Sequence, residues 1–251
     1  MAQKLRKQEA DAIKAIDDLL QLFEKYSVPV TWAVVGKVFL DHPEIIEKIR
    51  SSRVPHEIAY HSFSHVLFSE CGYERAEAEI LEGIKLGADF GIDFTSFVFP
   101  ENNIAHTQLL KKYGFQIYRG ANFLDRNVNK NLLILEKNAV LSKIIAPPVR
   151  PMLKDGIWEI PSSMWFYDRF PYALTLIYRT KQGIKRAIKE NKVFHLFMHP
   201  EELLIKPQLI DKLEEVLRYV EIKKNQNKIY PITMGGLIDF WKLRVSNDDE
   251  L

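Results

Sequence analysis

Two histidine pairs, each spaced four residues apart, are the features of this sequence most able to do chemistry. The stretch HEIAYHSFSH, residues 56–65, contains His61 and His65 just after a run of strand-forming residues. Neutral imidazoles bind zinc and similar divalent ions at about 2.0–2.1 Å. The two rings must then converge, which a strand running into a tight turn allows. The spacing therefore predicts a metal site at His61 and His65, although a purely structural role for such a pair stays open.

The second pair lies in VFHLFMHP, residues 193–200, which reads as a strand. An even spacing places His195 and His199 on the same face of that strand. His199 immediately precedes Pro200, so we expect it at the carboxyl end of the strand, where a catalytic group belongs. His195 lies deeper in the strand, and we expect it to be a hydrogen-bonded core histidine.

A catalytic divalent ion also needs a third ligand, commonly a carboxylate. Glu57 is near in sequence, but four residues of strand would separate it from His61 by about 13 Å. We therefore expect Glu57 to be structural and His56 to be a solvated residue at the start of the strand. Two pairs of adjacent acids elsewhere are expected to be solvated charges: Asp17 with Asp18, and Asp248 with Asp249. The residues alone leave the ligand set incomplete.

The elements that must position these histidines alternate between strand and helix. Apolar residues at helical spacing predict helices over 10–26, 43–52, 73–91, 105–114, 172–190, 207–226 and 237–244. Apolar and β-branched runs predict strands over 28–36, 56–62, 96–100, 115–120, 156–163, 191–200 and 228–233, the first of them buried on both faces. Residues 121–155, with APPVRP, are expected to be irregular or extended.

This alternation predicts one domain over residues 1–251, of the α/β class. The short spacing of the units favours a parallel sheet or barrel with helices outside. In such folds the chemistry sits at the carboxyl ends of the strands, which is where His61, His65 and His199 are expected.

The composition excludes several classes of protein. With 35 basic and 33 acidic residues, net charge +2 and no basic tract, we expect neither a nucleic-acid nor a membrane partner. The single cysteine, Cys71, excludes an internal disulfide and fits a reducing compartment. The first residues lack the apolar core of a signal peptide, and no apolar run has the length of a membrane span. We therefore expect a cytoplasmic chain, unless an authentic N-terminus has been removed.

Five segments, taken in order, resemble the polysaccharide deacetylase family, also called the NodB-homology or carbohydrate esterase 4 type. They are TWAVVGKVF, HEIAYHSFSH, SFVFPENN, LLKKYGFQIYRG and FHLFMHPEEL, and the likeness runs from about residue 10 to about residue 205. The resemblance implies a distorted (β/α) barrel with a metal site at its open end. It also implies a hydrolase that removes N-acetyl groups from amino sugars in polymers.

The resemblance assigns roles to individual residues. The family's His-(Ser/Thr)-x-x-His motif matches His61, Ser62 and His65, which implies that the two histidines bind a divalent metal such as zinc. The late histidine motif matches His199, which implies a general acid that protonates the departing amine. Such an ion would polarise the acetyl carbonyl and lower the pKa of bound water, and donors at the site would stabilise the developing oxyanion. WEIPSSMW falls where the family places residues lining the acetyl pocket, so its residues Pro161 and Trp165 are candidates for substrate binding or for the core.

Two departures from the family pattern concern the base. The family begins with a strand that ends in an acidic motif, which supplies the general base and the third metal ligand. MAQKLRKQE stands in that place and has no strand pattern. The family's arginine that orients the base is replaced by Glu101, which could approach the metal or reflect relaxed demand. Arg119 could pair with Glu101, with a substrate carboxylate, or in a surface ion pair of little energetic weight.

Without its first strand, the barrel exposes the edges of two neighbouring strands, which another segment or a second subunit in a homo-oligomer would cover. Two functions follow for this chain. One is a metal-dependent, deacetylase-like hydrolase acting on N-acetylated sugars of a polysaccharide or another non-peptide C–N bond, truncated or of reduced activity. The other is a non-catalytic protein of the same fold that binds a carbohydrate or a partner protein.

Overall fold

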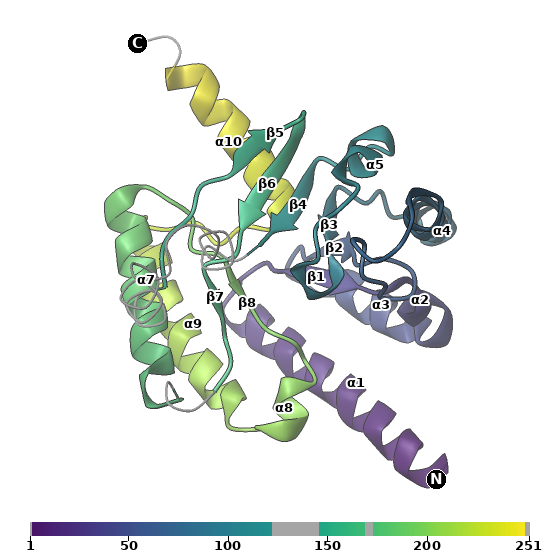
Figure 1. Ribbon diagram of the computed structural model, residues 1–251. Coiled ribbons are helices and arrows are strands. Elements are labelled where there is room, and N and C mark those ends of the chain that lie inside the picture. The colour runs from purple at the N-terminus through teal and green to yellow at the C-terminus, as the bar shows by residue number, and fades with distance from the viewer. Residues whose placement is uncertain (1, 122–145, 169–172, 249–251) are drawn as a thin grey trace, which may run out of the picture.

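The computed structural model describes the backbone of residues 2–121, 146–168 and 173–248 (Figure 1). The strands are β1 Thr31–Val34, β2 Glu57–Tyr60, β3 Ser96–Val98, β4 Ile117–Gly120, β5 Met152–Lys154, β6 Ile157–Pro161, β7 Met164–Trp165 and β8 Leu196–Phe197. The helices are α1 Ala2–Lys25, α2 Gly36–Asp41, α3 Pro43–Arg50, α4 Tyr73–Phe90, α5 Thr107–Lys112, α7 Leu176–Glu190, α8 Glu202–Ile205, α9 Leu209–Asn225 and α10 Met234–Asp248. Short 3-10 turns span Pro100–Asn102 and Ala173–Thr175.

The strands confirm the predicted α/β class. Six of them form one sheet in the order β1-β2-β3-β4-β6-β5, parallel from β1 to β6, with β5 antiparallel to β6. β7 and β8 form a separate parallel pair. The described strands do not close into a barrel, because the outer edge of β1 has no strand partner among them. That edge is on the side where the family's first strand was expected.

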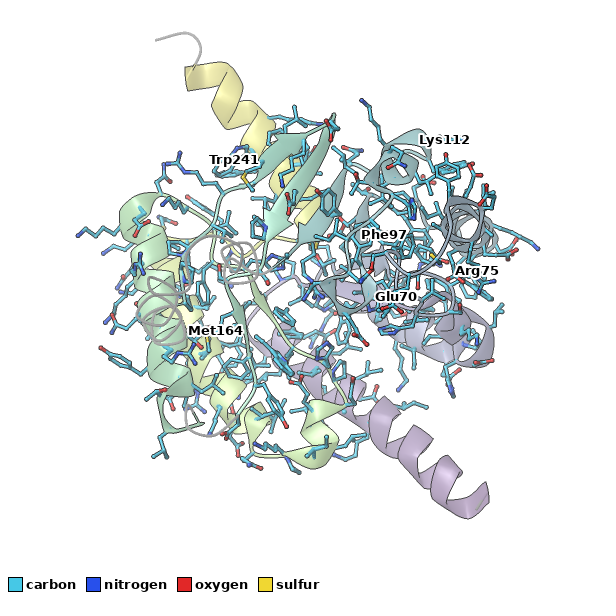
Figure 2. All side chains as sticks on the ribbon, in the orientation of Figure 1. Glu70, Arg75, Phe97, Lys112, Met164 and Trp241 are labelled. Atoms are coloured by element: carbon cyan, nitrogen blue, oxygen red, sulfur yellow. The ribbon has the colours of Figure 1, made fainter. Side chains whose placement is uncertain are left out.

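The two faces of the sheet bury different side chains, because successive strand residues point to opposite faces. Phe97 of β3 packs with apolar residues of α4 and α5, while Val98 and Ile117 pack against Leu237 of α10. A further core joins α1, β1 and α3 to α7, α8 and α9, and includes Met164 of β7. Figure 2 shows Phe97 and Met164 on opposite sides of the centre of the molecule.

The predicted helices are present, with small shifts at their ends. α1 begins at Ala2 rather than near Ala10, and its N-terminal end projects from the body in Figure 1. α4 ends at Phe90, and the next residue, Gly91, caps it with a φ of 63°, the left-handed value that glycine adopts at little cost. Among the described residues, no helix combines the length and apolar composition that a membrane crossing requires.

Strand β1 differs from its prediction in burial. Trp32 and Val34 pack into the core with residues of α1, but Ala33 between them is exposed. The expected burial on both faces is therefore wrong. As an edge strand of the sheet, β1 has β2 as its only strand neighbour among the described residues.

Two segments near β6 and α10 were assigned incorrectly from the sequence. Residues 228–233 form no strand: Pro231 has no N–H to donate to a ladder, and Tyr230 is 68% exposed, so the run buries too little apolar surface. β5 was not predicted. It turns back into β6 through Asp155 and Gly156, whose φ values of 49° and 80° suit a two-residue hairpin turn. Residues 122–145, most of the region expected to be irregular, lie outside the described residues.

Candidate active site

The segment after β2 brings the first histidine pair together. The His61 N–H donates to the Val34 carbonyl (3.0 Å), which continues the β1–β2 ladder by one residue. The chain then turns sharply, with positive φ at both Ser62 (58°) and His65 (59°), and the Ser62 hydroxyl accepts from the His65 N–H (2.9 Å). The His61 and His65 rings lie with centroids 4.9 Å apart at 81°. The strand-to-turn geometry expected for this pair is therefore present.

Glu79, a buried residue of α4, holds this turn in place. Its carboxylate accepts the N–H groups of Phe63 and Ser64, both at 2.8 Å, and the Ser64 hydroxyl at 2.7 Å. Gly36 supports the turn from the other side, since its N–H donates to the Ser62 carbonyl (2.8 Å). A Cβ at Gly36 would lie 2.7 Å from the Phe63 ring, so only glycine allows this close approach.

The surroundings of His61 keep its ring neutral and fix its tautomer. Its Nδ1 lies 2.6 Å from the Val98 carbonyl. Because a carbonyl only accepts, Nδ1 carries the hydrogen and Nε2 keeps a free lone pair. Burial is the main cause that lowers the pKa of His61 to about 4; the positive charges of Arg119, His65 and His199 act in the same direction, and the Val98 hydrogen bond acts against them. These four groups therefore lie close enough to interact electrostatically.

A neutral imidazole held by a backbone carbonyl is how metal-binding histidines are usually oriented. In that respect His61, with His65 beside it, fits a divalent ion. The described residues do not complete the set, because no group of three or more His, Cys, Asp or Glu side chains among them is arranged to hold a metal. The structure thus supplies two candidate ligands and no third.

The second histidine of interest, His199, lies after β8 and is bound to a glutamate of α8. Its Nδ1 lies 2.7 Å from Oε1 of Glu202, which is only 4% exposed. The same oxygen accepts from Nε1 of Trp165 at 2.6 Å. The hydrogen bond to Glu202 raises the pKa of His199, against the effect of partial burial. A histidine with an acidic partner at Nδ1 and a raised pKa is suited to donate a proton from Nε2.

Aromatic rings surround this dyad. Trp165 stacks on Tyr167 (4.9 Å between centroids, 13° between planes) and lies nearly parallel to Phe197 (6.3 Å, 9°). Both Trp165 and Phe197 meet the His199 ring edge-to-face, at 5.7 Å and 6.0 Å. Trp165 is 39% exposed, so it is not a core residue and presents part of its indole to the solvent.

Arg119 at the end of β4 connects the two histidine regions. Its register partner in β3 is Val98, the residue whose carbonyl binds His61. Its guanidinium lies over the Phe197 ring, 4.6 Å from the centroid, and its Nε donates to Asn102 Oδ1 (3.0 Å). The side chain is 9% exposed. Among the described residues Arg119 forms neither the pair with Glu101 that the sequence allowed nor a surface ion pair, since the guanidinium is buried and its bonded partner is Asn102.

The remaining predicted residues take different positions. Glu101 is exposed, with a φ of 52°, and belongs to no ion pair among the described residues. Pro161 is buried at the end of β6, and its carbonyl accepts from Nδ1 of His195 (3.1 Å). Burial lowers the pKa of His195 to about 4. His195 is hydrogen-bonded, as expected, but it is half-buried rather than a core residue, and Pro161 contributes its backbone to this arrangement.

His56 and Glu57 face the opposite end of β2. His56 is not a solvated strand start: its Nδ1 accepts from the Val30 N–H (3.2 Å), and its ring meets the Phe23 and Trp32 rings. Burial lowers its pKa. Glu57 is structural, as expected, and accepts from Thr31, Ser96 and the Gly235 N–H. A hollow of about 400 Å³ at this end includes both residues and lies away from the histidine cluster.

Three residues of the site were missed in the sequence: Glu79, Asn102 and Glu202. Glu202 follows His199 by three residues in HPEEL, a spacing that puts both on one side of a helical turn. That signal was available. Glu79 and Asn102 are distant in sequence from the groups they bind, so no local pattern identifies them.

Comparisons with known proteins agree with this fold. A family model described as polysaccharide deacetylase matches residues 12–118. The chitooligosaccharide deacetylase of Sinorhizobium fredii is 31% identical over 65 residues, which are 26% of this chain and 29% of that protein. The match thus spans less than a third of the curated relative's length.

Solved structures extend the likeness to most of the chain. A candidate polysaccharide deacetylase from Mycobacterium smegmatis gives a TM-score of 0.72 at 18% identity, covering 95% of this chain and 80% of that one. A CE4 family pseudoenzyme from Bacillus anthracis gives 0.50 at 10% identity, covering 88% and 59%. At these identities the structures show the fold alone. Together with the family model, they confirm the resemblance inferred from the five sequence segments.

Proposed function

This chain is a relative of the polysaccharide deacetylases, and from that premise we propose that it is a deacetylase-like hydrolase acting on N-acetylated sugars of a polysaccharide. The bond it would break is the C–N bond of an acetamido group, with water as the second reactant and acetate and a free amine as products. The observation that carries the proposal is the His199–Glu202 dyad, placed within electrostatic reach of the convergent pair His61 and His65.

His199 is the proton donor in this proposal. Glu202 holds the Nδ1 hydrogen and raises the pKa of the ring. The imidazolium form, with its second proton on Nε2, is thereby favoured. As the C–N bond breaks, Nε2 gives this proton to the departing nitrogen, so the product leaves as an amine rather than as an unstable anion. Trp165 fixes the shared Glu202 oxygen from the other side.

His61 and His65 would hold a divalent ion, with zinc the natural choice for imidazole ligands. The ion would supply a Lewis acid for the acetyl carbonyl and a more acidic bound water. The Val98 carbonyl orients His61 so that Nε2 is the available nitrogen, and Glu79 fixes the turn that carries His65. A third ligand and a general base are required in addition, and the described histidine cluster contains neither.

That gap favours a second candidate function. A protein of this fold that binds N-acetylated carbohydrate without hydrolysing it would need the aromatic and polar surface around Trp165 but no base. The fold occurs in a CE4 family pseudoenzyme as well as in deacetylases. The two functions differ in one observable, the release of acetate.

The test combines metal content with acetate release from short N-acetylated chito-oligomers. We expect about one zinc ion per chain after exposure to zinc and removal of the excess, and its loss in His61→Ala. We expect His199→Ala to retain the metal but to lose about 100-fold or more of the acetate release. His42→Ala is the matched control, since His42 lies between α2 and α3 and the one hydrogen bond of its side chain among the described residues is to Glu44.

The outcomes separate the candidates. Equal acetate release by the wild-type chain and His199→Ala would remove His199 from the mechanism. Binding of the oligomers with no acetate release by the wild-type chain would establish the non-catalytic function. Unchanged zinc content in His61→Ala would exclude the proposed metal site.

A further inference from the structure

Arg119 has more hydrogen-bonding capacity than the described residues use. A guanidinium carries five N–H donors, and among the described residues only Nε has a bonded partner, Asn102. The side chain is 9% exposed. Its terminal nitrogens are not among the fully buried polar atoms without a partner, so they keep contact with the solvent at the site. A nearly buried arginine with free terminal donors is rare in a core and common in a binding site.

No negative charge among the described residues balances Arg119. Burial is the one cause that moves its pKa, to about 10, and no carboxylate contributes. The group therefore remains charged at neutral pH. Its charged or chargeable neighbours are His61, His195 and His199, whose own pKa values respond to it. A divalent ion on His61 and His65 would add further positive charge. Glu202 is already engaged by Trp165 and His199.

The face of the guanidinium is also fixed. It lies on the Phe197 ring at 4.6 Å, and Phe197 is nearly parallel to the partly exposed Trp165. Because Asn102 holds Nε, the plane of the guanidinium cannot rotate freely. A planar donor fork that is fixed in advance suits a carboxylate, which can accept two parallel hydrogen bonds from it.

We propose that Arg119 is the docking group for a carboxylate on the substrate, so that the chain prefers an N-acetylated polysaccharide with acidic sugars over a neutral one. This rests on the proposed function only in that the ligand is an N-acetylated carbohydrate; it does not require hydrolysis. Trp165 is 39% exposed, so its indole can contact a sugar ring beside the carboxylate, and the charge of Arg119 acts on both His61 and His199.

The test is calorimetric binding of two matched oligosaccharides to the full chain. One is a tetrasaccharide of alternating N-acetylglucosamine and glucuronate, and the other is the same molecule with its carboxylates reduced to alcohols. We expect the acidic form to bind about tenfold to a hundredfold more tightly, the range for hydrogen bonds to charged groups. We expect Arg119→Gln to abolish this preference and Arg119→Lys to retain only part of it, because lysine lacks the fork.

Two variants guard against misfolding and against a general charge effect. Asn102→Asp leaves Arg119 in place but puts a carboxylate on its Nε, so we expect it to weaken the preference without removing the arginine. Arg53→Gln removes an exposed arginine at the other end of β2 and should leave the preference unchanged. Thermal unfolding of each variant establishes that it is folded.

Each outcome has one meaning. A preference that survives Arg119→Gln in a folded protein, or that Arg53→Gln reduces as much, would overturn the assignment of Arg119. Equal binding of both oligosaccharides would overturn this inference and leave the carbohydrate function intact. No binding of either would reject the carbohydrate ligand itself. N-acetylglucosamine 6-phosphate binding more tightly than the acidic tetrasaccharide, through Arg119, would overturn carboxylate in favour of phosphate.

Discussion

Two buried glutamates organise the two halves of the site in different ways. Glu79, 2% exposed, binds two backbone N–H groups and the Ser64 hydroxyl, and pairs with Arg75. Glu202, 4% exposed, bonds through Oε1 to Trp165 and His199, while Oε2 is buried with no partner among the described residues. Glu79 therefore fixes a backbone shape, and Glu202 tunes a side chain. The position of His61 and His65 therefore depends on the backbone conformation of their turn, and the protonation of His199 depends on the charge of Glu202.

The largest expected effect is on stability, at Glu79. Glu79→Ala leaves the N–H groups of Phe63 and Ser64 without their acceptor in a buried turn, and we expect a loss of about 3–5 kcal/mol in the free energy of unfolding. Urea denaturation measures it. Glu82→Ala, an exposed position on the same helix, should change stability by less than about 0.5 kcal/mol. Similar losses at both positions would show that Glu79 does not organise the turn.

Protonation of the histidines should change the stability of the fold in opposite directions, depending on the histidine. The folded-state pKa values of His61 and His195 are about 4, below the ordinary 6.5. The unfolded chain therefore takes up these protons first, and stability is lost as the pH falls from about 6.5 to 4. When both histidines are fully protonated, the loss in the free energy of unfolding is about 3 kcal/mol for each of them. The raised pKa of His199 acts the other way: its contribution is present below about 6.5 and is lost as the pH rises through the folded-state value.

Urea denaturation of the metal-free chain across this pH range tests the asymmetry. His61→Gln should flatten the acid limb of the stability curve, because glutamine does not titrate and can still donate to the Val98 carbonyl. An acid limb that His61→Gln leaves unchanged would contradict the low pKa of His61. His42→Gln is the control, because the His42 side chain bonds to the exposed Glu44 rather than to a core residue.

Features set by contiguous residues could be predicted from the sequence, and features set by contacts in the folded chain could not. The His61 turn could be predicted because strand, motif and turn are contiguous, and local periodicity predicted most helices and the strands β1 to β4 and β6, but not β5. The exposure of Ala33 could not be predicted, because nothing in TWAV shows that β1 pairs on only one side among the described strands. The error at His56 has a similar origin, since Phe23 and Trp32 reach it only in the folded chain. Arg119 was noticed, but its partner Asn102 required the fold.

The smallest expected effect on stability, and the sharpest test of the comparison, is Glu202→Gln. The amide can still accept from His199 Nδ1 and Trp165 Nε1, so the cost in unfolding free energy should be about 1–2 kcal/mol. The pKa of His199 should fall toward the ordinary histidine value, because the accepting group no longer carries a charge. NMR titration of the His199 ring protons measures this fall.

Glu201→Gln is the matched control for that titration. Glu201 is exposed and acts on His199 only through its charge, while Glu202 acts first through the hydrogen bond. We therefore expect Glu201→Gln to lower the pKa of His199 by much less. If the two substitutions lower it equally, His199 responds to the local net charge and not to its bonded partner. Glu202 would then position the ring as Glu79 positions the turn, and the contrast between the two halves of the site would disappear.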